Sequence, residues 1–134
     1  MPRPLNVMLI EDSAEIRIAL VQGIEASGAL TVNAAAANSS DAIRIIDSGD
    51  IDAAIIDLHL KGGSGLMVLT HLQQTGNPHR VLRIVLTNHT APAFRRSCMN
   101  LGADHFLDKS LEFDRAIELL EEHALQRNIP PAAA

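Results

Sequence analysis

Short apolar segments alternate along the chain with longer segments in which apolar residues recur at helical spacing. The short segments are rich in Ile, Val, Leu and Ala, which is typical of buried parallel strands. They span residues 5–10, 30–36, 53–56, 82–86 and 103–107. The longer segments predict helices between Ser13 and Gly28, between residues 38–40 and Gly49, from 66 to a turn at 76–78, from about Pro92 to Gly102, and over 113–126.

This alternation predicts a fold class. Strands that are each followed by a helix pair in parallel through right-handed crossovers, and their helices cover both faces of the sheet. We therefore expect an α/β three-layer sandwich with a five-stranded sheet and five helices. No linker or repeat divides the sequence, so we predict one domain over 1–134, with its core at about 5–126 and a frayed tail at 128–134.

Composition narrows the classes of function. The formal net charge of −5 gives no reason to expect direct nucleic-acid binding, which normally needs a basic face. The single cysteine, Cys98, cannot form an internal disulfide, and we expect it in the core or as inert surface. No apolar run approaches the length of a membrane span, and residues 1–4 lack the apolar segment of a signal peptide. We expect a cytoplasmic protein without membrane insertion.

Polar residues stand where the predicted strands end. Glu11 and Asp12 follow the first strand, Asp57 follows the third, Thr87 ends the fourth and Lys109 follows the fifth. Taken alone, Asp57 could merely begin a turn, which is the commoner role of an Asp after a strand. Because parallel strands end at one edge of the sheet, where open α/β sheets place their sites, we expect these side chains to lie close together.

The types of these residues suggest phosphoryl chemistry. Three clustered carboxylates repel one another unless a cation neutralises them or one binds a proton. Their hard oxygen atoms favour Mg²⁺. An Asp can be a covalent nucleophile toward phosphorus, as in aspartyl-phosphate enzymes. Thr87 and Lys109 would then hold the transferred oxygens.

Four pieces of this sequence together resemble the receiver domain of two-component response regulators. They are Glu11-Asp12, the segment from Asp57 to Gly65, Leu86-Thr87, and the segment from Gly102 to Lys109. Each piece is weak alone, but their joint spacing over residues 5 to about 125 is highly specific. The resemblance implies the flavodoxin-like fold of chemotaxis regulators, with strand order 2-1-3-4-5.

The resemblance also implies roles for individual residues. Asp57 would accept phosphate from a histidine kinase or a histidine phosphotransfer protein. Mg²⁺ would be bound by Asp12, Asp57 and the backbone carbonyl of His59, with Glu11 assisting through water. Thr87 and Lys109 would contact the phosphoryl group. The protein would catalyse its own phosphoryl transfer and slow dephosphorylation, and would not be a turnover enzyme.

Four positions depart from the family pattern. Lys61 and Ser110 stand where proline is common, and Asn88 stands where a small residue is usual. The family has two switch positions, which are Thr87 and Phe106 in this chain. Phe106 is aromatic but lacks a hydroxyl group. A cis peptide before a residue other than proline costs about 2.5–4 kcal/mol, so we expect the Lys109–Ser110 peptide to be trans.

If the chain is complete, we expect no effector domain after the receiver and output through a downstream target protein; a homodimer is a further candidate assembly. The expected binding surface lies on the fourth helix, fifth strand and last helix, and its candidate residues are Arg95, Arg96, His105, Phe106, Glu118 and Glu122.

Other classes of function fit parts of the same pattern. A phosphate-independent interaction module and a phosphate sink for a kinase stay open. An aspartyl-phosphate hydrolase would usually carry an acid two residues after its nucleophile, where this chain has His59. A flavodoxin-like protein would need a phosphate-binding loop where this chain has Glu11 and Asp12.

Overall fold

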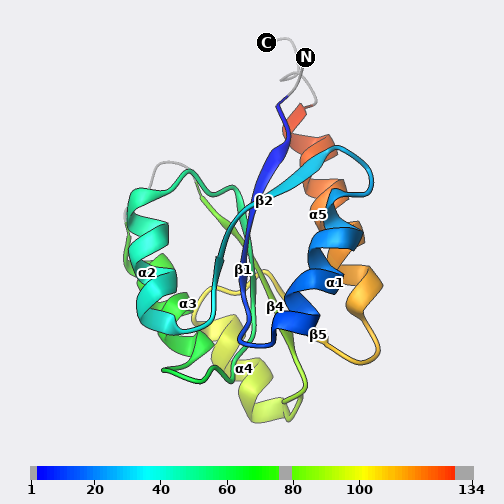
Figure 1. The fold of residues 1–134 in the computed structure, drawn as a ribbon. Helices are drawn as coiled ribbons and strands as arrows, with labels where there is room; N and C mark the ends of the chain where they lie inside the picture. Colours follow the sequence, from blue (N-terminus) through cyan, green and yellow to red (C-terminus); the bar gives the residue numbers. More distant parts are fainter. Residues whose placement is uncertain (1–2, 76–79, 129–134) are drawn as a thin grey trace, which may run out of the picture.

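A parallel sheet in the order β2-β1-β3-β4-β5 lies at the centre of the molecule (Figure 1), so the predicted strand order is confirmed. The computed structural model describes residues 3–75 and 80–128. Its strands are β1 (Leu5–Ile10), β2 (Leu30–Ala36), β3 (Ala53–Ile56), β4 (Leu82–Thr87) and β5 (His105–Asp108). Its helices are α1 (Ala14–Glu25), α2 (Ser39–Ser48), α3 (Gly65–Gln74), α4 (Pro92–Asn100) and α5 (Phe113–Asn128).

The two faces of the sheet carry separate apolar cores, which makes the fold a three-layer sandwich. Successive side chains of a strand point to opposite faces. Val7 and Leu9 of β1 therefore pack against α1 and α5, whereas Met8 and Ile10 pack on the side of α2, α3 and α4. Figure 1 shows these two groups of helices on opposite sides of the strands.

Polar caps fix the starts of three helices. The side chains of Ser13, Asn38 and Ser64 accept hydrogen bonds from backbone N–H groups in the first turns of α1, α2 and α3. Such caps satisfy donors that have no partner inside the helix. Helix α4 has no side-chain cap and begins instead at Pro92, whose missing N–H costs nothing in the first turn.

The last strand begins later than predicted. The sequence places it at 103–107, whereas β5 spans His105–Asp108. The Asp104 carboxylate accepts the backbone N–H of Arg83, with Asp104 Oδ2 2.8 Å from the nitrogen. A side chain therefore takes over a bond that strand pairing would otherwise make, and paired residues begin at His105.

The last helix also runs further than predicted, to Asn128 in place of Gln126. Arg127 forms an ion pair with Asp52, at 2.8 Å, and this holds the final turn against the sheet. The expected tail therefore does not begin at 128. Residues 129–134 and the predicted turn at 76–78 lie outside the described residues. None of the helices within 3–75 and 80–128 is long and apolar enough to cross a membrane.

Cys98 lies in the core on the α2–α4 side, which confirms the first of the two predicted locations. Burial raises the pKa of its thiol to about 11. At pH 8 we expect a thiol-modifying reagent to label the native protein at least about 100-fold more slowly than the protein in concentrated urea, because the thiolate is the reactive form. Native and unfolded rates within about threefold of each other would contradict this burial.

Candidate functional site

The carboxyl ends of β1 and β3 place the three predicted acids together. These strands are neighbours, with Ile10 paired to Ile56, so Asp57 emerges beside Glu11 and Asp12. The Asp57 N–H donates to the Ile10 carbonyl at 2.9 Å, which holds the two strand ends in register. One carboxylate oxygen from each acid lies within 4.8 Å of the other two. The expectation that these side chains cluster at one edge is confirmed.

Lys109 reaches this cluster from the loop after β5. Its Nζ donates to Glu11 Oε1 at 2.5 Å and to Asp57 Oδ2 at 2.8 Å. The side chains of all three residues are about 90 % buried or more. Charge-assisted hydrogen bonds of this kind are roughly twice as strong as neutral ones, so Lys109 orients both carboxylates.

Burial and pairing shift the pKa values of this pair. Burial raises the pKa of the Glu11 carboxyl, and the Lys109 hydrogen bond only partly opposes that effect. Burial alone would lower the pKa of Lys109, but its hydrogen bonds to Asp57 and Glu11 outweigh burial and raise it. The ammonium is therefore held in its charged form at neutral pH.

The cluster remains short of positive charge. Three carboxylates face one ammonium, and Asp57 Oδ1 is buried without a hydrogen-bond partner in the described part of the chain. A buried anionic oxygen with no partner is costly. Closely spaced hard oxygen ligands and an unpaired carboxylate oxygen are what a divalent cation such as Mg²⁺ requires. The residues present therefore fit the ion that the sequence predicts.

Thr87 lies at the same edge, fully buried at the end of β4. Its carbonyl accepts the backbone N–H of Lys109 at 2.9 Å, so the two predicted phosphoryl contacts are neighbours. Its hydroxyl accepts the backbone N–H of His89 at 3.1 Å. Among the described residues, that hydroxyl has no hydrogen bond to the carboxylate cluster. The Lys109–Ser110 peptide is trans, as predicted.

The glycine-rich loop after β3 turns tightly beside Asp57. A Cβ atom on Gly65 would clash with the Asp57 carbonyl oxygen, so a larger residue would displace the backbone of the central acid. Gly63 has a φ of +81°, a conformation that strongly favours glycine. The loop thus requires glycine for close approach at one position and for backbone conformation at another.

A pair of histidines near this edge was not predicted. The rings of His59 and His89 stack with their centroids 3.4 Å apart, and Phe94 meets both rings edge-on. His59 stands two residues after Asp57 and His89 two residues after Thr87, so these positions were visible in the sequence. The contact between them depends on the spacing of two loops, which the sequence does not give.

The expected output surface is only partly exposed. Arg95, Arg96, Glu118 and Glu122 are exposed or partly exposed and His105 is half-buried, but Phe106 is buried. Phe106, a candidate residue of the expected partner surface, is therefore covered by its neighbours in this structure. Its ring packs into the core, and the Arg95 guanidinium carbon lies 5.8 Å from the ring centroid.

Comparison with known proteins agrees with this fold. The chain belongs to the response regulator receiver domain family, whose family model matches residues 7–121. Its function is that of a receiver domain in two-component signal transduction.

Curated relatives cover nearly all of the chain. The nitrate/nitrite response regulator protein NarL of Escherichia coli K12 is 27% identical over 121 residues, which are 90% of this chain and 55% of NarL. The cyclic di-GMP phosphodiesterase RocR of Pseudomonas aeruginosa is 29% identical over 95% of this chain and 33% of RocR. The chain thus spans about half the length of NarL.

Solved structures show the same fold. The response regulator domain of CheB from Thermotoga maritima superposes with a TM-score of 0.76 at 23% identity, over 96% of this chain and 100% of that one. A CheY-like receiver domain protein from Methanospirillum hungatei gives a TM-score of 0.78 at 20% identity, over 92% of this chain and 96% of that one. These likenesses place the chain among CheY-like folds.

Proposed function

We propose that Asp57 is the phosphoacceptor of this receiver domain. The observation that carries the proposal is the state of its carboxylate, with Oδ2 bound by Lys109 at 2.8 Å and Oδ1 buried without a partner among the described residues. An Asp57 oxygen would attack the donor's phosphorus, so that a new O–P bond forms. The bond between phosphorus and the donor's histidine nitrogen breaks, and that nitrogen retains the electron pair.

The surrounding residues would bind the phosphoryl oxygens and the metal ion. Lys109 would shift its hydrogen bond from Asp57 to a phosphoryl oxygen, and the Thr87 hydroxyl would bind another. Asp12, Asp57 and the His59 carbonyl would hold Mg²⁺, with Glu11 acting through water. The ion would neutralise charge between the carboxylates and the phosphoryl oxygens.

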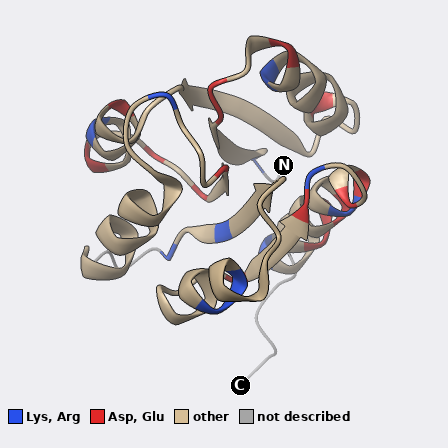
Figure 2. Ribbon diagram, turned by 90° about the horizontal axis from the view of Figure 1, so that it is seen from below, with Lys and Arg blue, Asp and Glu red and all other residues tan. Residues whose placement is uncertain are grey.

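We also propose the wider role that accompanies this chemistry. Residues 1–134 would act as a single cytoplasmic receiver domain that accepts phosphate from a histidine kinase or a histidine phosphotransfer protein. Dephosphorylation would be slow, and no substrate would be turned over. Figure 2 shows basic and acidic positions spread over several helices, and the formal net charge of the chain is −5, which favours a protein partner over nucleic acid.

The direct test is incubation with acetyl phosphate and Mg²⁺, followed by intact-mass measurement. We expect one added phosphoryl group that is lost on mild alkaline treatment, as an acyl phosphate would be. Chelation of Mg²⁺ with EDTA should prevent the addition. No adduct at any concentration of donor or Mg²⁺ would instead support a phosphate-independent interaction module.

Asp12 gives a prediction for the metal site. The Asp12→Ala protein should bind Mg²⁺ at least about tenfold more weakly, because one of three clustered oxygen donors is lost. Isothermal titration of the unphosphorylated protein measures this affinity. Asp114→Ala, which removes an acid from the first turn of α5, is the matched control and should bind Mg²⁺ as the parent does. Equal Mg²⁺ affinity of the two variants would mean that Asp12 is not a metal ligand.

Output would follow a population shift in the surface of α4, β5 and α5. We propose that phosphate at Asp57 draws Thr87 and Lys109 inward and changes the packing around Phe106. Partner binding should then differ with and without beryllofluoride, a stable phosphate mimic, and Arg95→Ala should reduce the difference. Equal affinity in both states, for every partner found, would favour a phosphate sink.

A further inference from the structure

Arg83 is a buried cation on a strand of the core. It lies in β4, opposite Ala54 of β3, and its side chain points to the face covered by α2, α3 and α4. Only 8% of Arg83 is exposed, whereas arginine is almost never fully buried without a partner. The residue therefore needs a compensating negative group.

The described residues only partly neutralise and hydrogen-bond the buried Arg83 guanidinium. One terminal nitrogen of Arg83 donates to the Leu72 carbonyl in the last turn of α3, at 3.1 Å. The Nε atom is buried and has no hydrogen-bond partner, and no carboxylate pairs with the guanidinium among residues 3–75 and 80–128. A helix carboxyl end carries about half a negative charge, which is less than this cation requires.

A second arginine increases the positive charge here. Arg80 donates to Asp104 Oδ2 at 2.9 Å and to the Gly102 carbonyl at 3.2 Å. The Asp104 carboxylate pairs with Arg80 and only influences Arg83 from nearby, so two guanidinium groups lie near one carboxylate and a net positive charge remains. Burial lowers the pKa of Arg83, the nearby Arg80 charge lowers it further, and Asp104 opposes them.

Both arginines line a cavity of about 380 Å³. Its other lining residues come from the end of α3, the start of β4 and the connection from α4 to β5, and are Leu72, Gln73, Thr75, Val81 and Gly102. Gly102 has a φ of +93°, and a Cβ atom there would lie 2.9 Å from Arg83 Nη1. Glycine at this position therefore leaves the guanidinium uncovered on the side of the cavity.

We propose that this cavity binds a small oxyanion, a phosphate or carboxylate group held by the guanidinium groups of Arg83 and Arg80. A planar guanidinium presents paired N–H donors that match the oxygens of either group. The cavity borders the start of β4, and Asp57 lies at the carboxyl edge of the sheet. The proposed site is therefore distinct from the phosphoacceptor and does not depend on it.

The test is an NMR titration of the whole chain in Mg²⁺-free buffer, with inorganic phosphate in one arm and malonate in the other. Sodium chloride at matched ionic strength is the reference. We expect saturable shifts at the Arg83 Nε–H and the Gly102 N–H with at least one of the two anions. The arm that saturates at the lower concentration identifies the preferred oxyanion. Shifts that stay linear in both arms, or that chloride reproduces, would overturn the proposal.

Variants locate the binding. Arg83→Met keeps a long side chain without its charge and should weaken anion binding at least about tenfold. Gln73→Glu, on the exposed end of α3, adds a carboxylate at the rim and should weaken it similarly, which keeps the test decisive if Arg83→Met does not fold. Arg44→Gln, an exposed change on α2, is the control and should bind as the parent does. Parental affinity in Gln73→Glu would overturn the assignment.

Discussion

Replacing Asp57 by asparagine should abolish phosphate uptake while the fold is retained. Asparagine has nearly the same shape as aspartate, so its side-chain oxygen can still accept the hydrogen bond that Lys109 donates to Asp57. Its amide lacks the anionic oxygen that attacks phosphorus. Intact-mass measurement after acetyl phosphate treatment with Mg²⁺ should therefore find only the unmodified protein.

The control is a second acid at the same edge of the sheet. Asp108 ends β5, and its carboxylate accepts the backbone N–H groups of Ser110 and Leu111 at 2.8 and 3.2 Å. Asp108→Asn should take up one phosphoryl group, as the parent does. If Asp57→Asn still gains the same labile phosphate, the acceptor is another residue and the assignment fails.

The strands were predictable from the sequence because of how they are buried. Both faces of this sheet are covered by helices, so β3 is an uninterrupted apolar run and β1 is an apolar run broken only by Asn6. The bounds of both strands can therefore be taken directly from the residues. The errors in β5 and α5 have a different cause. Asp104 replaces a strand bond and Asp52 holds the last helical turn, and both contacts join segments that are distant in the chain.

The sequence predicted at which edge of the sheet the site lies, but not how the side chains there contact one another. Parallel topology alone brings Glu11, Asp12 and Asp57 together once the strands are assigned. How Lys109 divides its hydrogen bonds between two of the acids depends on the path of the loop after β5. The same holds for Phe106. Its place in the family pattern identifies it as a switch residue, but the packing around it decides whether its ring is buried in the core or exposed to solvent.

Arg83 shows what a hydropathy pattern conceals. A single charged residue in an otherwise apolar strand does not disturb the strand prediction, and nothing in the pattern separates it from a solvated edge position. Its importance emerges only from its burial, its Nε without a partner among the described residues, and the cavity beside it. A charge inside a predicted core strand therefore indicates a position whose partner should be sought.

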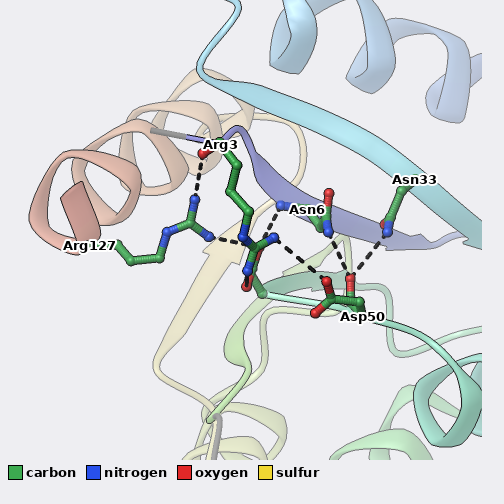
Figure 3. A network of polar contacts seen from close by, with 6 residues as sticks. Arg3, Asn6, Asn33, Asp50 and Arg127 are labelled. Carbon is green, nitrogen blue, oxygen red and sulfur yellow. Dashed lines mark hydrogen bonds and ion pairs between the residues drawn. The ribbon is translucent and has the colours of Figure 1, made fainter. Parts of the chain in front are cut away.

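Replacing Asp52 by alanine should cause a large loss of stability. Asp52 lies at the amino edge of the sheet, and its side chain is 1% exposed. It accepts the Asn6 backbone N–H at 2.8 Å and pairs with Arg3 at 3.3 Å and with Arg127 at 2.8 Å. Figure 3 shows Arg3 and Arg127 approaching each other from the start of the chain and the last helix.

The alanine variant would leave these donors without their shared acceptor. Removing one partner of a buried ion pair typically costs about 3–5 kcal/mol, because the remaining charge stays desolvated. Arg3 is half exposed and can turn to water, so we expect a loss of about 3 kcal/mol in the free energy of unfolding. Urea denaturation followed by circular dichroism measures this loss.

Asp50 provides the matched control, because it is also an acid beside Arg3 but is 73% exposed and 3.7 Å away. Asp50→Ala should cost less than about 1 kcal/mol, and the difference from the parent should shrink further in high salt. The Asp52→Ala loss should persist in high salt, since buried charges are screened weakly. Equal losses in the two variants would mean that Asp52 acts as another surface charge, and that the end of α5 is held by apolar packing alone.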